Sequence, residues 1–87
     1  MKISQMKNLG EVNEAKLNQV GIMNSESLIR LGTEQAFLKV RDLVDDGACM
    51  NFLLALEGAI QDVPKKEITS ERKTALQAFY RQVCSEK

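Results

Sequence analysis

The 87-residue sequence contains no histidine, no tryptophan and a single proline, and only two of its residues are cysteines. The absence of histidine excludes Ser-His-Asp and Cys-His catalysis, histidine-containing zinc sites and the commonest proton shuttle near neutral pH. Neither a GxxxxGKS or GxxxxGKT phosphate loop nor a GxGxxG fingerprint occurs. We therefore expect no catalytic residue, no metal site, no cofactor and no enzyme activity.

The two cysteines, Cys49 and Cys84, do not form a CxxC pair. We expect reduced thiols that pack as small hydrophobic side chains, although the sequence is also compatible with a disulfide between them. The N-terminus leads into no hydrophobic signal region and carries no lipidation motif. We therefore expect a cytoplasmic protein.

Acidic and basic residues balance, with 12 of each and a formal net charge of zero. This balance argues against a global attraction to nucleic acid or to an anionic membrane. The charges are unevenly distributed, because residues 1–62 hold six basic and nine acidic side chains, a net of −3, whereas residues 63–87 hold six and three, a net of +3. Such a division can orient a binding partner.

The longest apolar segment covers residues 49–60 and has neither a proline nor the alternation of a strand. A helix that is apolar nearly all round is buried by its neighbours. At about three turns it is too short to span a membrane. We predict a central core helix from about Ala48 to Gln61.

Two residues of this segment do not fit a simple core helix. Glu57 falls inside the apolar arc, where an unpaired carboxylate would be costly. We expect it to be a structural polar core residue that accepts backbone amides at a neighbouring helix start or pairs with Arg30 or Arg41. A catalytic role is less favoured, since no second acid or base accompanies it. Gly58 weakens a helix by about 1 kcal/mol relative to alanine, so we expect it to permit a close helix–helix approach, within the chain or across a dimer.

Four further helices are predicted from apolar spacing and from the turn residues between the segments. They cover residues 11–20, 25–31, 34–44 and the segment after Thr69 or Ser70. Asn24, Thr33 and Thr69 are suitable N-caps. In the first of these segments the apolar positions Val12, Ala15, Leu17 and Val20 suit a short amphipathic helix better than a strand. In the second we expect Leu28, Ile29 and Leu31 to pack. Five helices and no strand predict one all-α domain, residues 1–87, arranged as a compact bundle around the central helix.

The glycine turns near the N-terminus have a second interpretation, as a phosphate-binding site. Glycine turns beside helix starts can present backbone amides to a phosphate, and Lys7 and Lys16 add positive charge near Gly10. On physical grounds alone, glycines that cap short helices need no ligand.

Several segments resemble the C-terminal domain of the TfoX/Sxy competence regulators. They are Asn8-Leu9-Gly10, Leu17-Asn18-Gln19-Val20-Gly21-Ile22, Ser27-Leu28-Ile29-Arg30-Leu31-Gly32 and the run from Asn51 to Ile60. The resemblance covers roughly residues 6–80. It implies an all-α fold related to helix-hairpin-helix and SAM-like domains, a link to bacterial competence gene expression, and DNA contact through the Gly10 turn. The usual second glycine of such a hairpin is missing, because Glu11 and Val12 follow Gly10.

These observations lead us to predict a non-enzymatic regulatory or protein-interaction module. Its partner would be another protein or a second copy in a homodimer. The alternative is weak, non-sequence-specific DNA binding through Lys7, Gly10 and Lys16. We expect no membrane contact and no small-molecule substrate.

Overall fold

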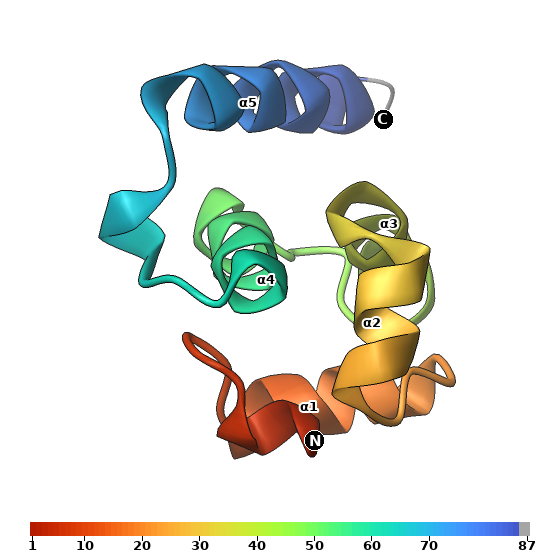
Figure 1. Cartoon of the computed structure of the whole chain (residues 1–87). Helices are drawn as coiled ribbons and strands as arrows, with labels where there is room; N and C mark the ends of the chain where they lie inside the picture. The colour runs from red at the N-terminus through yellow and green to blue at the C-terminus, as the bar shows by residue number, and fades with distance from the viewer. Residues whose placement is uncertain (86–87) are drawn as a thin grey trace.

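The computed structural model describes residues 1–85, and within that range every regular element is helical (Figure 1). The elements in chain order are the 3-10 turn η1 (Ile3–Gln5), α1 (Glu11–Gln19), α2 (Ser25–Leu31), α3 (Thr33–Leu43), α4 (Met50–Gln61), the 3-10 turn η2 (Lys65–Glu67) and α5 (Ser70–Ser85). The predicted all-α class and the five helices are confirmed. Among these residues, no helix is both long enough and apolar enough to cross a membrane.

Helix α4 occupies the middle of the molecule, with α5 on one side, α1 on the opposite side and α3 beside it (Figure 1). Leu53 and Leu56 are fully buried, as predicted for a central core helix. The helix begins at Met50, because Cys49 has an extended backbone, and it ends where Asp62 adopts a left-handed conformation. Ala48, which we expected near the start of the helix, lies buried in the preceding turn.

An aromatic cluster centred on Phe37 joins α3 to α4 and α5. The Phe37 ring centroid lies 6.1 Å from that of Phe52, 6.2 Å from that of Phe79 and 6.0 Å from that of Tyr80. The last two rings meet Phe37 edge-on, an arrangement that favours aromatic pairs. Together with the fully buried Leu76, these rings attach α5 to the rest of the core.

The apolar face predicted for α1 is confirmed only in part, because Leu17 and the partly buried Val20 pack on the core but the other two positions do not. Only Leu17 is buried in this helix, whereas Val12 is 71% exposed and Ala15 is also exposed. The apolar side chains on this side of the core come from the segment before α1, where Ile3, Met6 and Leu9 are buried. These isolated apolar residues before α1 therefore fill the part of the core that the helical periodicity led us to expect α1 to fill.

Two of the three predicted helix caps are confirmed. Asn24 Oδ1 accepts the Ser27 amide at 2.9 Å at the start of α2, and Thr69 Oγ1 accepts the Arg72 amide at 3.2 Å before α5. Thr33 does not cap α3, since Gly32 takes that position. The Thr33 hydroxyl instead donates to Glu57.

The cysteines are free thiols, but both are exposed. The expectation that they pack as small hydrophobic side chains is therefore wrong. Cys49 sits at the surface in the extended residue before α4, and Cys84 lies in the last turn of α5.

Candidate functional site

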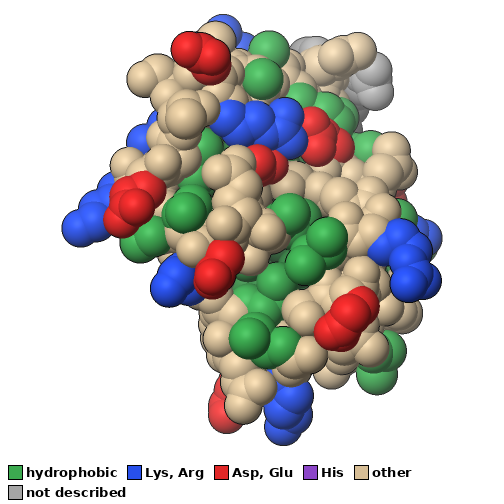
Figure 2. Space-filling view, in the orientation of Figure 1, with side chains coloured by type: hydrophobic (Ala, Val, Ile, Leu, Met, Phe, Trp, Pro, Cys, Tyr) green, Lys and Arg blue, Asp and Glu red, His purple; other side chains and the backbone are tan. Residues whose placement is uncertain are grey.

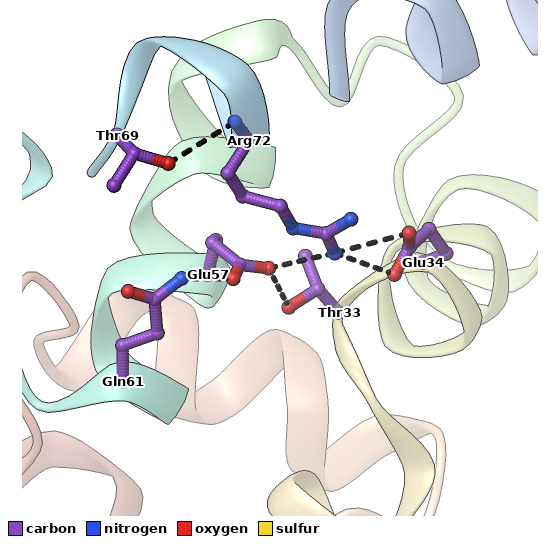
Figure 3. Close-up of polar contacts among 6 residues, drawn as sticks. All are labelled: Thr33, Glu34, Glu57, Gln61, Thr69 and Arg72. Carbon is purple, nitrogen blue, oxygen red and sulfur yellow. Dashed lines mark hydrogen bonds and ion pairs between the residues drawn. The ribbon is translucent and has the colours of Figure 1, made fainter. Parts of the chain in front are cut away.

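A network of polar side chains around Glu57 connects α3, α4 and α5 (Figure 3). Glu57 Oε1 accepts the Thr33 hydroxyl at 2.8 Å and Arg72 Nη2 at 2.9 Å. The same guanidinium nitrogen lies 3.0 Å and 3.1 Å from the two carboxylate oxygens of Glu34. Gln61 Nε2 donates to the second oxygen of Glu57. The network therefore satisfies a carboxylate whose residue is only 6% exposed.

The electrostatics of the network follow from its partners. Burial raises the pKa of Glu57, but hydrogen bonds from Arg72, Gln61 and Thr33 outweigh burial, so the pKa lies below its usual value. The hydrogen bond to Glu57 raises the pKa of Arg72. Glu57 and Arg72 are consequently both charged at neutral pH, and they stabilise each other inside the fold.

The predicted burial of Glu57 is correct, but its predicted partners are wrong. Within the described part of the chain, Glu57 pairs with neither Arg30 nor Arg41. Arg41 instead donates to the Val83 carbonyl at 2.9 Å and to Asp42 at 3.3 Å. Sequence reasoning missed Arg72 because nothing local links it to Glu57. The only signal was that Arg72 lies in the first turn of a helix that must pack on the core.

Gly58 allows a close approach of a kind that the sequence did not reveal. A Cβ atom there would lie 2.3 Å from Asn8 Nδ2 and 2.7 Å from the Val63 carbonyl oxygen. Asn8 Nδ2 donates to that carbonyl at 2.9 Å, and Asn8 Oδ1 accepts the Lys65 amide at 3.2 Å. The neighbours of Gly58 are thus a side chain and a turn, and the expected helix–helix contact at this position is wrong.

The three residues predicted for nucleic-acid contact are not arranged as a free cationic surface. Lys7 Nζ lies 4.0 Å from Asp62 Oδ1, and Lys16 Nζ lies 2.8 Å from Asp45 Oδ2. Gly10 is the extended N-cap of α1 and leaves open space around its Cα. The first turn of α1 carries Glu11 and Glu14, which disfavours a phosphate at this position.

An apolar groove lies elsewhere on the surface. It has a volume of about 170 Å³, and its lining consists of Met1, Met6, Ile29, Ala59 and Ile60 together with Ser25 and Asp62. These residues come from the N-terminal segment, from α2 and from the end of α4, so we call it the α2–α4 groove. Figure 2 shows hydrophobic side chains gathered in the middle of this face of the molecule.

The exposure and charge of the groove distinguish it from the core. Of the α2 side chains that we expected to pack, Leu28 is fully buried and Leu31 packs partly buried against the core, whereas Ile29 is 53% exposed at the edge of the groove. The lining contains no lysine or arginine side chain, and its one carboxylate, on Asp62, has a side chain that is 85% exposed. The groove thus combines an apolar floor with two solvated charged groups, the Asp62 carboxylate and the Met1 ammonium, and the ammonium lies 3.1 Å from Glu26 Oε1.

Comparison with known protein families identifies the family to which this chain belongs. The model of the TfoX C-terminal domain matches residues 1–80, which is nearly the whole chain. The chain belongs to the TfoX C-terminal domain family. A comparison with curated proteins gave no match.

Two solved structures are similar to this chain in both sequence and fold. An uncharacterised protein from Listeria monocytogenes, in a triclinic crystal form, is 31% identical with a TM-score of 0.93, over 95% of this chain and 93% of that one. A protein of unknown function from the same organism, in a tetragonal form, is 32% identical with a TM-score of 0.90, over 94% of this chain and 99% of that one. Two solved structures therefore share the fold of this chain over nearly its whole length.

Proposed function

We propose that this TfoX C-terminal domain is a non-enzymatic protein-interaction module that docks a partner in the α2–α4 groove. The observation that carries the proposal is the exposed apolar lining of the groove, with Ile29 at its edge. Burying such a surface stabilises a complex through the hydrophobic effect. The regulatory effect of this domain then depends on the function of the partner.

The shape and charge of the groove favour an amphipathic helix as the occupant. Helices that bind grooves insert apolar side chains spaced at i, i+3 or i+4 and i+7. Asp62 makes one long contact with Lys7, at 4.0 Å, and its exposed carboxylate is placed to attract a further cation beside that stripe. The partner helix should therefore carry lysine or arginine next to its apolar face.

The alternative function, weak DNA binding, receives less support from the geometry. Lys7 and Lys16 each face a carboxylate, and Glu11 follows the Gly10 turn. A gel shift at low salt tests this alternative, because binding through phosphates weakens steeply as salt rises. Salt-sensitive binding that Lys7→Gln and Lys16→Gln abolish would favour DNA over the groove.

The protein-interaction proposal is tested by affinity capture with three matched baits. They are the wild-type chain, Ile29→Glu in the groove and Val12→Glu on the exposed side of α1, a second exposed apolar residue outside the groove. A docking partner should be retained by wild type and Val12→Glu and lost with Ile29→Glu. Equal retention by both variants would rule out the groove as the docking site.

A second copy of the chain is the competing occupant. Light scattering coupled to size exclusion distinguishes it, because a groove-mediated homodimer would become monomeric with Ile29→Glu and remain dimeric with Val12→Glu. If the wild-type chain is a monomer at high concentration, the occupant of the groove is a different protein.

A further inference from the structure

A second cleft, with a volume of about 240 Å³, lies between α1, the start of α4 and the connector at η2. We call it the Lys16–Lys65 cleft. Three asparagines and two lysines form its polar wall, and Phe52 lies in its apolar part. Its lining contains no acidic residue among those described, and it shares no residue with the α2–α4 groove.

Asn8 fixes one wall of this cleft. Its backbone is left-handed, with φ of 68°, and its side chain bridges the Val63 carbonyl and the Lys65 amide. A conformation of this kind is tolerated by asparagine better than by most residues. These two hydrogen bonds hold the backbone of Lys65 at the edge of the cleft.

Lys16 is fixed on the opposite side. Its ammonium lies 2.8 Å from Asp45 Oδ2 and 5.8 Å from the centroid of the Phe52 ring. An ammonium has three N–H donors, and Asp45 takes one of them. The ion pair therefore orients the lysine and leaves donors for a second acceptor.

The remaining polar groups of the wall are not used by the fold. Within residues 1–85, the side chains of Asn13, Asn51 and Lys65 make no hydrogen bond or ion pair, and Lys65 brings a positive charge that no carboxylate in that range pairs with. The lining residues thus supply amide and ammonium groups, which are donors suited to an oxyanion. Because the cleft is smaller than the roughly 300–1,000 Å³ of sites for drug-sized ligands, its ligand should be small.

We propose that the Lys16–Lys65 cleft binds a small phosphate-bearing ligand, with the two ammonium groups and the Asn13 and Asn51 amides as donors to its oxygens. The binding involves no covalent step. The ligand is free phosphate or a small phosphate monoester, and the cleft serves as a binding site separate from the groove.

The proposal is tested by titrating the full chain with inorganic phosphate and with glycerol phosphate at constant ionic strength, while following its amide resonances by NMR. We expect saturable shifts of the Asn13 and Asn51 side-chain amides. Lys65→Gln should weaken binding about tenfold, as expected for loss of a charged hydrogen bond. The adjacent Lys66→Gln, outside the cleft, should change the Kd by about twofold or less. Asn51→Ala, an exposed position, should also weaken binding without changing the unfolding midpoint.

Different arms of the titration identify the source of the phosphate. Stronger binding of glycerol phosphate than of free phosphate would indicate a monoester, and the reverse would indicate the ion itself. Saturation by a short single-stranded oligonucleotide alone would overturn the proposal in favour of nucleic acid. Equal weakening by Lys65→Gln and Lys66→Gln, equal binding of acetate, or the absence of saturable shifts would each overturn it as well.

Discussion

At the scale of single residues, Glu57 brings three helices together. Its carboxylate accepts Thr33 from α3 and Arg72 from α5 while the residue itself belongs to α4. A buried ion pair is not necessarily stabilising in net terms, but removing one partner leaves a buried group unsatisfied. The consequence for stability can be measured directly.

Glu57→Gln keeps the shape of the side chain and removes its charge. We expect it to lower the free energy of unfolding by about 1–3 kcal/mol, the usual range for a hydrogen bond to a charged group. Chemical denaturation followed by circular dichroism measures this loss. The control is Glu71→Gln, an exposed carboxylate in the first turn of α5, which should be close to neutral. An unchanged unfolding midpoint for Glu57→Gln would refute the structural role.

The same carboxylate makes stability depend on pH. Because the pKa of Glu57 is lowered in the folded protein from its usual 4.5, the ionised group contributes stability above about pH 4.5 and loses it as the pH falls through the folded-state pKa. Glu57→Gln lacks this contribution. The difference in stability between wild type and Glu57→Gln should therefore shrink on acidification, as thermal unfolding at several pH values would record. A difference that grows toward low pH would contradict the assigned direction.

Gly58 gives a third prediction at this scale. Alanine is normally about 1 kcal/mol better than glycine inside a helix, but here the added Cβ would lie 2.7 Å from a backbone carbonyl. We expect Gly58→Ala to destabilise the fold by about 1–3 kcal/mol, as overpacking commonly does. Equilibrium denaturation in urea measures the change. A gain in stability would show that the Asn8 and Val63 turn can move aside.

At the scale of elements, α5 depends on few contacts for its position. Leu76 is its only fully buried side chain among those described, and Phe79, Tyr80 and Val83 pack against the core from partly exposed positions. Arg72 adds the polar attachment to Glu57 and Glu34. Loss of the apolar anchor should therefore affect the whole helix.

Leu76→Ala is expected to cost about 2–5 kcal/mol, the range for removing a buried leucine side chain. Hydrogen exchange should show the largest loss of protection in α5. Leu43→Ala is the matched control, because Leu43 is 72% exposed, and such surface changes usually stay within about 0.5 kcal/mol. Similar costs for the two leucines would mean that α5 is held mainly by its polar contacts.

The elements also show what sequence could predict. Helix α4 was predictable, because an apolar run bounded by a turn and by Pro64 has few other structures. The surface position of α1 was not, since its periodicity suited an amphipathic helix with one face on the core, and only packing decides that Ile3, Met6 and Leu9 fill that space instead. The Glu57–Arg72 pair was missed for the same reason, because a contact between helices leaves no local spacing to detect.

At the scale of the whole molecule, the surface divides into regions with different chemistry. The α2–α4 groove is apolar with Asp62 at one end, whereas the Lys16–Lys65 cleft is polar and carries lysines. Neither was visible as a motif, because each is assembled from three separate segments of the chain. The sequence led us to expect that Ile29 packs in the core. In the structure it is exposed and forms an edge of the groove.

The groove is tested most directly by a photo-reactive amino acid at position 29, compared with the same amino acid at position 12, in the cell from which the protein comes. Mass spectrometry then identifies the segment that becomes cross-linked. We predict that position 29 captures one segment with apolar residues at helical spacing and lysine or arginine beside them, and that position 12 does not capture it. Capture of the same segments from both positions, or of a segment without that pattern, would contradict docking of an amphipathic helix in the α2–α4 groove.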